Sequence, residues 1–181
     1  MNKSGYLKKG NMSILQIVKY GNPTLTKKAE EIINLDKYIE ELAHNMIQTM
    51  YAAPGIGLAA PQVNESKRLI TVDLSVGENS QNLIILINPE LISQEGELIS
   101  EEGCLSVPDI NEKVARPSRI IIRGIDLKGN EKTVEAEGLL ARVLCHEIDH
   151  INGKLFIDHL SFLKKSLIKK KLKRAIQTGK I

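Results

Sequence analysis

The chain has 181 residues, of which 42% are hydrophobic and 26% charged, as in a single globular domain with a sizeable core. This composition excludes a disordered or collagen-like chain, and no apolar run approaches the roughly 18 residues of a membrane span. Aromatic residues make up only 3% of the chain, which disfavours a surface that stacks single-stranded nucleic acid. We therefore expect a cytoplasmic protein that binds neither membranes nor specific nucleic-acid sequences.

Charge is distributed unevenly along the chain. Residues 1–11 carry three lysines and residues 161–181 carry eight basic residues, and neither segment contains an acidic residue. Residues 12–160 therefore hold 14 basic against 22 acidic side chains. We expect a disordered extension at 1–11, a folded domain at 12–160, and a basic amphipathic helix with its tail at 161–181.

The first predicted element is a helix from Asp36 to about Tyr51. Asp36 is a good N-cap, and apolar residues follow at helical spacing, at Ile39, Leu42, Met46 and Met50. Pro54 then ends the pattern.

Short strands are predicted in the middle of the chain. The segments Leu69–Leu74 and Leu83–Ile87 are rich in β-branched and aliphatic residues and are separated by turn residues. A further pair, Arg119–Asp126 and Glu131–Glu135, is predicted to form a hairpin, because Gly129-Asn130 lies between them.

Two more helices are predicted, from about Gly138 to Ile151 and from about Phe162 to Ile176. The first should end at Asn152-Gly153, a pair suited to a left-handed cap. Strands flanked by helices without βαβ alternation indicate an α+β fold. We expect short antiparallel strands packed around the Gly138–Ile151 helix, with one helix before them and a basic helix at the end.

The strongest chemical signal lies in that central helix, in the run His146-Glu147-Ile148-Asp149-His150. Two histidines four residues apart lie on one helical face, so both imidazoles can bind one metal. Glu147 between them can reach a water on that metal. Leu139 and Val143 continue the same face, which predicts that the histidines point inward.

A metal site needs a third ligand, and the candidates are Cys104, Cys145, His44, His159 and several carboxylates. Cys145 is turned about 100° from His146 around the helix, so it is expected to point away from the metal. Cys104 follows Gly103 in a short extended segment that ends at Pro108, and such a segment can lay a thiolate beside the helix. The sequence therefore favours Cys104.

A third motif is the small-residue segment Gly55-Ile56-Gly57-Leu58-Ala59-Ala60-Pro61-Gln62. Small residues allow close backbone approach, and the Gln62 amide can donate a hydrogen bond to a developing oxyanion. The segment lacks the Lys-Ser/Thr ending of a phosphate loop, so a nucleotide site is not expected.

Together the three motifs resemble those of the peptide deformylases, which remove the formyl group from the initiator methionine of nascent chains. The residues Gly55–Gln62, Glu102–Ser106 and His146–His150 fit the family's motifs in the family's order, and the resemblance extends from about Met12 to Ile176. One departure is Cys145, where many members have glutamine. The domain at 12–160 is thus expected to be a deformylase domain.

The resemblance also implies a mechanism and a role for each site residue. Attack of a metal-bound water on the formyl carbon would be assisted by Glu147, and the oxyanion would be held by the Gln62 amide and the Leu105 backbone N–H. The implied groups are metal ligands Cys104, His146 and His150; substrate contacts Gly57, Ile56, Leu139 and Val143; and a supporting ion pair of Glu102 with Arg116.

The resemblance implies Fe(II) as the native metal in many members, with zinc, nickel or cobalt able to occupy the same ligands. Its implied substrate is the formyl-Met end of nascent peptides. In some members a terminal helix docks at the ribosome, which makes residues 161–176, with seven positive charges, a candidate ribosome-binding helix.

Two rival functions share parts of this pattern. A zinc endopeptidase would use Glu147 in the same way but needs a third ligand downstream, where His159 is the candidate. A metal-stabilised binding module would need a fourth ligand such as Cys145. A Cys104–Cys145 disulfide would remove the metal site altogether.

Overall fold

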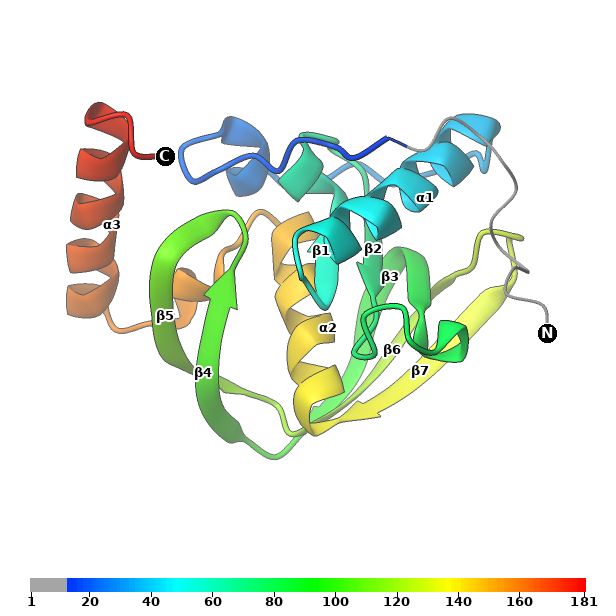
Figure 1. Ribbon diagram of the computed structural model, residues 1–181. Helices are drawn as coiled ribbons and strands as arrows, with labels where there is room; N and C mark the ends of the chain where they lie inside the picture. Colours follow the sequence, from blue (N-terminus) through cyan, green and yellow to red (C-terminus); the bar gives the residue numbers. More distant parts are fainter. Residues whose placement is uncertain (1–12) are drawn as a thin grey trace.

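The computed structural model describes residues 13–181. The extension predicted at residues 1–11 lies outside the described residues. Figure 1 shows a curved hairpin and a larger sheet on either side of one helix, with a terminal helix against the outer side of the hairpin. None of the helices in the described part of the chain is long and apolar enough to cross a membrane.

The first helix, α1 (Lys37–Ala52), begins where the sequence predicts. The Asp36 carboxylate caps it by accepting a hydrogen bond from the Ile39 N–H at 3.1 Å. The buried face of α1 includes Ile39, Met46 and Met50, as their spacing predicts.

Five antiparallel strands form the main sheet, in the spatial order β1-β2-β3-β6-β7. Their bounds are β1 Gly57–Ala59, β2 Leu69–Val72, β3 Ile84–Glu95, β6 Arg119–Ile125 and β7 Glu131–Glu137. The hairpin predicted around Gly129-Asn130 is confirmed, because Ile125 pairs with Glu131 across it. Short 3-10 turns connect other elements, at Pro23–Thr26, Ala60–Val63, Ser80–Asn82 and Phe156–His159.

Strand β3 is longer than the predicted Leu83–Ile87, because Asn88-Pro89 does not end it. Asn88 adopts a positive φ of 49°, and the pairing of β3 with β6 shifts register between Ile87 and Glu90. These turn-forming residues therefore occupy a bulge inside a continuous strand, where a proline is tolerated.

A second, two-stranded sheet consists of β4 (Leu98–Cys104) and β5 (Val107–Arg116). The sequence predicted only a short extended segment here. Strand β4 mixes exposed apolar with charged residues, and β5 contains Pro108 and the positive-φ residue Asp109. Such a composition hides the alternation that identifies a strand.

Helix α2 (Gly138–Ile151) has the predicted bounds. It contacts β1, β2, β6 and β7. Alternate residues of β2 face opposite ways, so that Ile70 packs on the α2 side and Leu69 on the α1 side. The sheet thus lies between α1 and α2. The predicted cap is confirmed, since Gly153 has a φ of +71° and a Cβ there would collide with the Thr26 backbone.

Helix α3 (Phe162–Gln177) packs on the core through Ile168 and Leu172. Their core cluster includes Leu25, Val107 and Phe156, which come from three other parts of the chain. Two other apolar side chains of this helix, Leu163 and Leu167, are 69% and 61% exposed. The α+β class predicted from the sequence is confirmed.

Candidate metal centre and active site

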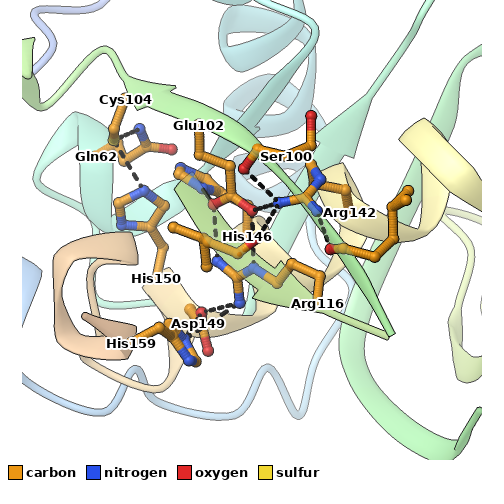
Figure 2. A network of polar contacts seen from close by, with 12 residues as sticks. Gln62, Ser100, Glu102, Cys104, Arg116, Arg142, His146, Asp149, His150 and His159 are labelled. Atoms are coloured by element: carbon orange, nitrogen blue, oxygen red, sulfur yellow. Dashed lines mark hydrogen bonds and ion pairs between the residues drawn. The ribbon is translucent and has the colours of Figure 1, made fainter. Parts of the chain in front are cut away.

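Helix α2 and the end of β4 bring three metal-ligating side chains together. His146 and His150 lie one helical turn apart, with ring centroids separated by 4.9 Å. The Cys104 Sγ lies 3.2 Å from the His150 Nε2, and Figure 2 draws this contact as a dashed line. The ligand atoms of Cys104, His146 and His150 all lie within 4.8 Å of one another.

Cys104 lies at the end of β4, where the hairpin turns. The pairing between β4 and β5 shifts register between Glu102 and Cys104, and the chain turns at Leu105-Ser106 to begin β5. Glu102 and Cys104 are two residues apart, so their side chains lie on the same face of the strand. Both side chains therefore reach α2.

Glu102 orients the first histidine. Its Oε2 lies 3.1 Å from the His146 Nδ1. An ionised carboxylate only accepts hydrogen bonds, so Nδ1 carries the ring proton and Nε2 presents its lone pair to the centre. The His150 Nε2 faces Cys104, and its Nδ1 is buried without a hydrogen-bond partner among the described residues.

A buried ion network stands behind this centre, drawn in Figure 2. Glu102 accepts hydrogen bonds from the Arg116 Nε at 2.9 Å and from the Arg142 Nη1 at 2.6 Å. Arg116 also donates to Asp149, whose carboxylate lies 2.6 Å from the His159 Nε2. All charged groups in this network therefore have partners.

The network controls the charge of Glu102. Burial alone would raise the pKa of Glu102, but hydrogen bonds from His146 and Arg116 outweigh burial and lower that pKa to about 2. Burial likewise opposes ionisation of Cys104, yet the two imidazoles hold the pKa of its thiol well below the ordinary value. Burial raises the pKa of Glu147 to about 7.

A cavity of about 550 Å³ opens in front of the centre. Its lining includes the predicted ligands Cys104 and His146 together with Glu147, and nearly all the other predicted site residues, namely Ile56, Gly57, Gln62, Glu102, Leu105, Leu139 and Val143. The remaining two, His150 and Arg116, lie behind this surface. Leu139 is 55% exposed at the mouth, whereas Val143 is buried.

Hydrogen bonds fix the orientation of the Gln62 side chain. Its Oε1 accepts from the Ala59 N–H at 2.8 Å, so the amide nitrogen turns the other way, to 3.6 Å from the Cys104 Sγ. Gln62 is almost fully buried. Its NH₂ group therefore lies at the cavity, next to Cys104.

The other candidate ligands lie outside the cluster. Cys145 is buried on another side of α2, and burial raises the pKa of its thiol to about 11. Both cysteines are free, which makes the disulfide alternative wrong. His159 is bonded to Asp149, and the His44 Nδ1 lies 2.6 Å from the Glu40 carbonyl oxygen.

Sequence reasoning missed Lys19, Arg142 and Asp149, and it considered His159 only as a candidate metal ligand. Arg142 offered a signal, because a charged residue inside the apolar stripe between Ala141 and Val143 needs a buried partner. Its partner is Glu102, 40 residues away. The Lys19 Nζ donates to the Leu105 carbonyl oxygen at 2.8 Å across 86 residues, and no local pattern indicates that contact.

The chemistry of the three donors fits a divalent metal. One thiolate and two imidazole nitrogens suit zinc or Fe(II), and three protein ligands are typical of a catalytic site. The Glu147 Oε2 beside them is buried without a hydrogen-bond partner among residues 13–181. Such an uncompensated carboxylate oxygen is a ready proton acceptor.

An α+β fold with these groups at the base of a cavity defines a hydrolase of the H-E-x-x-H class. Residues 14–166 match the family model described as polypeptide deformylase. The peptide deformylase of Thermodesulfovibrio yellowstonii is 54% identical over 162 residues, covering 90% of this chain and 98% of that protein.

Solved structures agree with this match. The crystal structure of a peptide deformylase from Legionella pneumophila superimposes with a TM-score of 0.85 at 39% identity, covering 92% of this chain and 98% of that one. The Ehrlichia chaffeensis peptide deformylase in complex with actinonin gives 0.82 at 36% identity, covering 90% and 98%. The chain belongs to the polypeptide deformylase family, whose metal-dependent hydrolases remove the N-formyl group from nascent peptides.

Proposed function

We propose that this chain hydrolyses the formyl amide of N-terminal formylmethionine with Cys104, His146 and His150 as metal ligands. The observation that carries the proposal is the cavity, which joins the ligand cluster and the unpartnered Glu147 oxygen to an apolar wall. The products are formate and the free α-amino group of methionine.

Glu147 is the proton shuttle in this proposal. When bound, a divalent metal acts as a Lewis acid on the formyl oxygen and lowers the pKa of water toward about 7. The Glu147 carboxylate takes the proton of the attacking water and returns it to the departing methionine nitrogen. Its burial beside the ligands and its free Oε2 support this role.

The Gln62 amide and the Leu105 backbone N–H are the proposed oxyanion donors. Gln62 is held by Ala59 with its NH₂ toward Cys104, so little reorganisation is needed when charge develops on the formyl oxygen. Leu105 directly follows Cys104 and also lines the cavity.

The methionine side chain is proposed to enter the apolar part of the cavity, at Ile56, Leu139 and Val143. Gly57 lies alongside and would offer its backbone to the peptide. A Cβ at Gly57 would collide with the Glu147 carboxylate and the Val143 side chain, so glycine is required for the close approach of β1 to α2.

Glu102 and Arg116 act as positioning residues in this account, because they hold the His146 ring in one tautomer. We propose Fe(II) as the native metal, with zinc, nickel or cobalt accepted by the same ligands. Metal analysis of protein purified anaerobically tests this. Bound zinc alone in such a preparation would contradict the iron assignment.

Formate release is the test of the reaction. The anaerobically purified enzyme should release formate from formyl-Met-Ala-Ser and leave Met-Ala-Ser intact, as measured by coupled formate oxidation and mass spectrometry. The unformylated peptide Met-Ala-Ser is the control substrate and should yield nothing. Cleavage of a peptide bond without loss of formyl would instead favour the endopeptidase.

We further propose that α3 docks the enzyme to ribosomes in the cytoplasm, where nascent chains are made. Some of its lysines already bind the body, since Lys164 pairs with Glu112 at 2.9 Å and Lys165 pairs with Asp158 at 2.7 Å. Lys170, Lys173 and Arg174 are exposed and make no ion pair among the described residues. These three supply charge for a polyphosphate surface.

Charge reversal tests docking better than deletion, because deleting α3 would expose the core beneath Ile168 and Leu172. A triple change of Lys170, Lys173 and Arg174 to Glu should weaken salt-sensitive co-sedimentation with ribosomes while peptide turnover persists. Changing Lys27, Lys28 and Lys37 to Glu is the matched control. Unchanged co-sedimentation of the α3 variant would contradict docking.

A further inference from the structure

The rim of the catalytic cavity carries two exposed charges. Besides Cys104, six charged or titratable side chains line the cavity, namely Lys19, Glu101, Glu102, Arg142, His146 and Glu147. Glu102 and Arg142 are buried and bonded to each other at 2.6 Å, while His146 and Glu147 belong to the centre itself. Lys19 and Glu101 alone among these six are exposed, so they are the charges that a bound peptide meets outside the centre.

The backbone around Lys19 is tied to the site on both sides. The Val18 N–H donates to the Gln62 carbonyl oxygen, and the Tyr20 N–H donates to the Ser106 carbonyl oxygen, both at 2.8 Å. Lys19 therefore lies between the segments that carry the two proposed oxyanion donors. Its position at the rim is fixed, although its side chain is exposed.

The Lys19 ammonium uses one of its N–H donors in the hydrogen bonds of the described residues. One donor goes to the Leu105 carbonyl oxygen at 2.8 Å, and an ammonium has three. None of the ion pairs within residues 13–181 involves Lys19. The positively charged Lys19 ammonium, with donors to spare, is thus held at Leu105, the residue that follows Cys104.

The position of the Lys19 charge indicates which residue of a bound peptide it would contact. When the formyl group lies at Cys104 and the methionine side chain enters the apolar wall, the following residue leaves the centre at the rim. Glu101 lies four residues before Leu105 on β4, roughly 13 Å away along an extended strand. Lys19 is therefore the rim charge nearer the reacting bond.

We propose that Lys19 is a specificity-determining residue that binds an acidic side chain at the residue directly after formylmethionine. This inference rests on the proposed function and names its substrate preference. An aspartate or glutamate at that residue gains an ion pair at the rim, and a lysine or arginine there is repelled.

The test compares kcat/KM for formyl-Met-Glu-Ser, formyl-Met-Gln-Ser and formyl-Met-Lys-Ser at low and at 0.5 M salt. The unaltered enzyme should prefer the Glu over the Lys peptide by about three- to tenfold, the scale of exposed charge interactions. High salt should reduce that ratio. The quantity compared between variants is the ratio of kcat/KM for the Glu peptide to kcat/KM for the Lys peptide. A change at Leu105 alters both values equally and therefore cancels in this ratio.

Lys19→Met should bring the ratio close to one, Lys19→Glu should invert it, and Lys19→Arg should retain it. Lys28→Met, another exposed lysine, should keep the ratio of the unaltered enzyme. A ratio near one in the unaltered enzyme, or an unchanged ratio in Lys19→Met, overturns the assignment while formate is still released. No formate from any of the three peptides defeats the proposed function instead. If Lys19→Met does not fold, Lys19→Arg and the salt series decide.

Discussion

The two sides of helix α2 differ in whether their buried charged groups have hydrogen-bond partners. Toward the cavity, the Glu147 carboxylate has an oxygen without a partner among the described residues. On the other side, Arg116, Asp149 and His159 bond to one another and to Glu102 in an unbroken series. The carboxylate oxygen that lacks a partner therefore lies on the side where substrate would bind, whereas the charged groups behind it are paired.

The side of α2 that carries the ion network also borders a cavity. This second cavity has a volume of about 440 Å³, and its lining includes Arg116, Cys145, Asp149 and His159. Helix α2 therefore stands between two cavities, and only the first contains the ligand cluster. Substitutions on the two sides should differ in kind, because the proposed chemistry takes place on the cavity side, whereas the ion network positions the proposed ligand His146.

The largest effect is expected on the cavity side, from Glu147→Ala. Loss of the proton shuttle should lower kcat by about 10²- to 10⁴-fold, while one metal per chain remains bound. Stopped formate assays and metal analysis measure the two quantities. Glu135→Ala, an exposed carboxylate on β7, is the control and should behave like the unaltered enzyme. Loss of metal from the Glu147 variant would make that residue a ligand instead.

The two cysteines separate the sides most clearly. Cys104→Ser should lose metal affinity, whereas Cys145→Ser should keep the metal and most of its activity, because only Cys104 belongs to the ligand cluster. Titration with a chelator measures the affinities. Activity should also fall in peroxide, since an accessible ligating thiolate is oxidised readily. Metal loss in the Cys145 variant alone would reverse the assignment.

On the paired side, Arg116→Met should destabilise the fold by about 3–5 kcal/mol, because it removes the cation shared by the buried Glu102 and the partly buried Asp149. Metal affinity should fall by about 10- to 100-fold as the Glu102–His146 contact loosens. Urea unfolding and chelator competition measure these effects. Arg119→Met is the matched control, since its ion pairs with Glu135 and Glu137 are exposed and contribute about 1 kcal/mol or less. Equal losses in both variants would contradict the network's role.

The smallest effect concerns a paired carboxylate outside the α2 network, at the end of β2. Asp73 is buried, which would raise its pKa, but hydrogen bonds from Ser75 and Tyr51 outweigh burial and lower that pKa. Its contribution to stability is therefore present above the unfolded pKa of about 3.9 and is lost as pH falls through the lower folded value. Tyr51→Phe removes a 2.6 Å hydrogen bond and should cost about 1 kcal/mol at neutral pH.

Acid unfolding followed by circular dichroism tests the sign of this effect. The Tyr51→Phe variant should unfold at a higher pH than the unaltered protein, because the folded pKa of Asp73 moves back toward its unfolded value. Tyr38→Phe is the control at an exposed Tyr–Glu65 hydrogen bond. An unchanged acid midpoint for Tyr51→Phe would show that this bond does not hold Asp73 ionised.

Helix α2 shows why part of this molecule could be predicted from its sequence. Its bounds follow from apolar periodicity and from Asn152-Gly153, both local signals. The two histidines and Glu147 lie within five residues, so helical spacing alone places them on adjacent faces. Nothing distant is needed for either inference.

Strand β3 and the β4–β5 hairpin show why the rest could not. An Asn-Pro pair usually ends a strand. At Asn88-Pro89 the chain instead forms a bulge, because β3 continues to pair with β6 on both sides of it. Arg142 and His159 likewise find partners on elements joined by tertiary packing. Such pairings are set by the whole fold and leave little local pattern.

The proposed mechanism requires that one metal binds one thiolate and two imidazoles at Cys104, His146 and His150. X-ray absorption spectroscopy of the zinc-loaded enzyme measures this ligand set. We expect one sulfur scatterer at about 2.3 Å and imidazole nitrogens at about 2.0–2.1 Å, unchanged in Cys145→Ser. A shell without sulfur, or one with two sulfurs, would contradict the ligand set and the mechanism built on it.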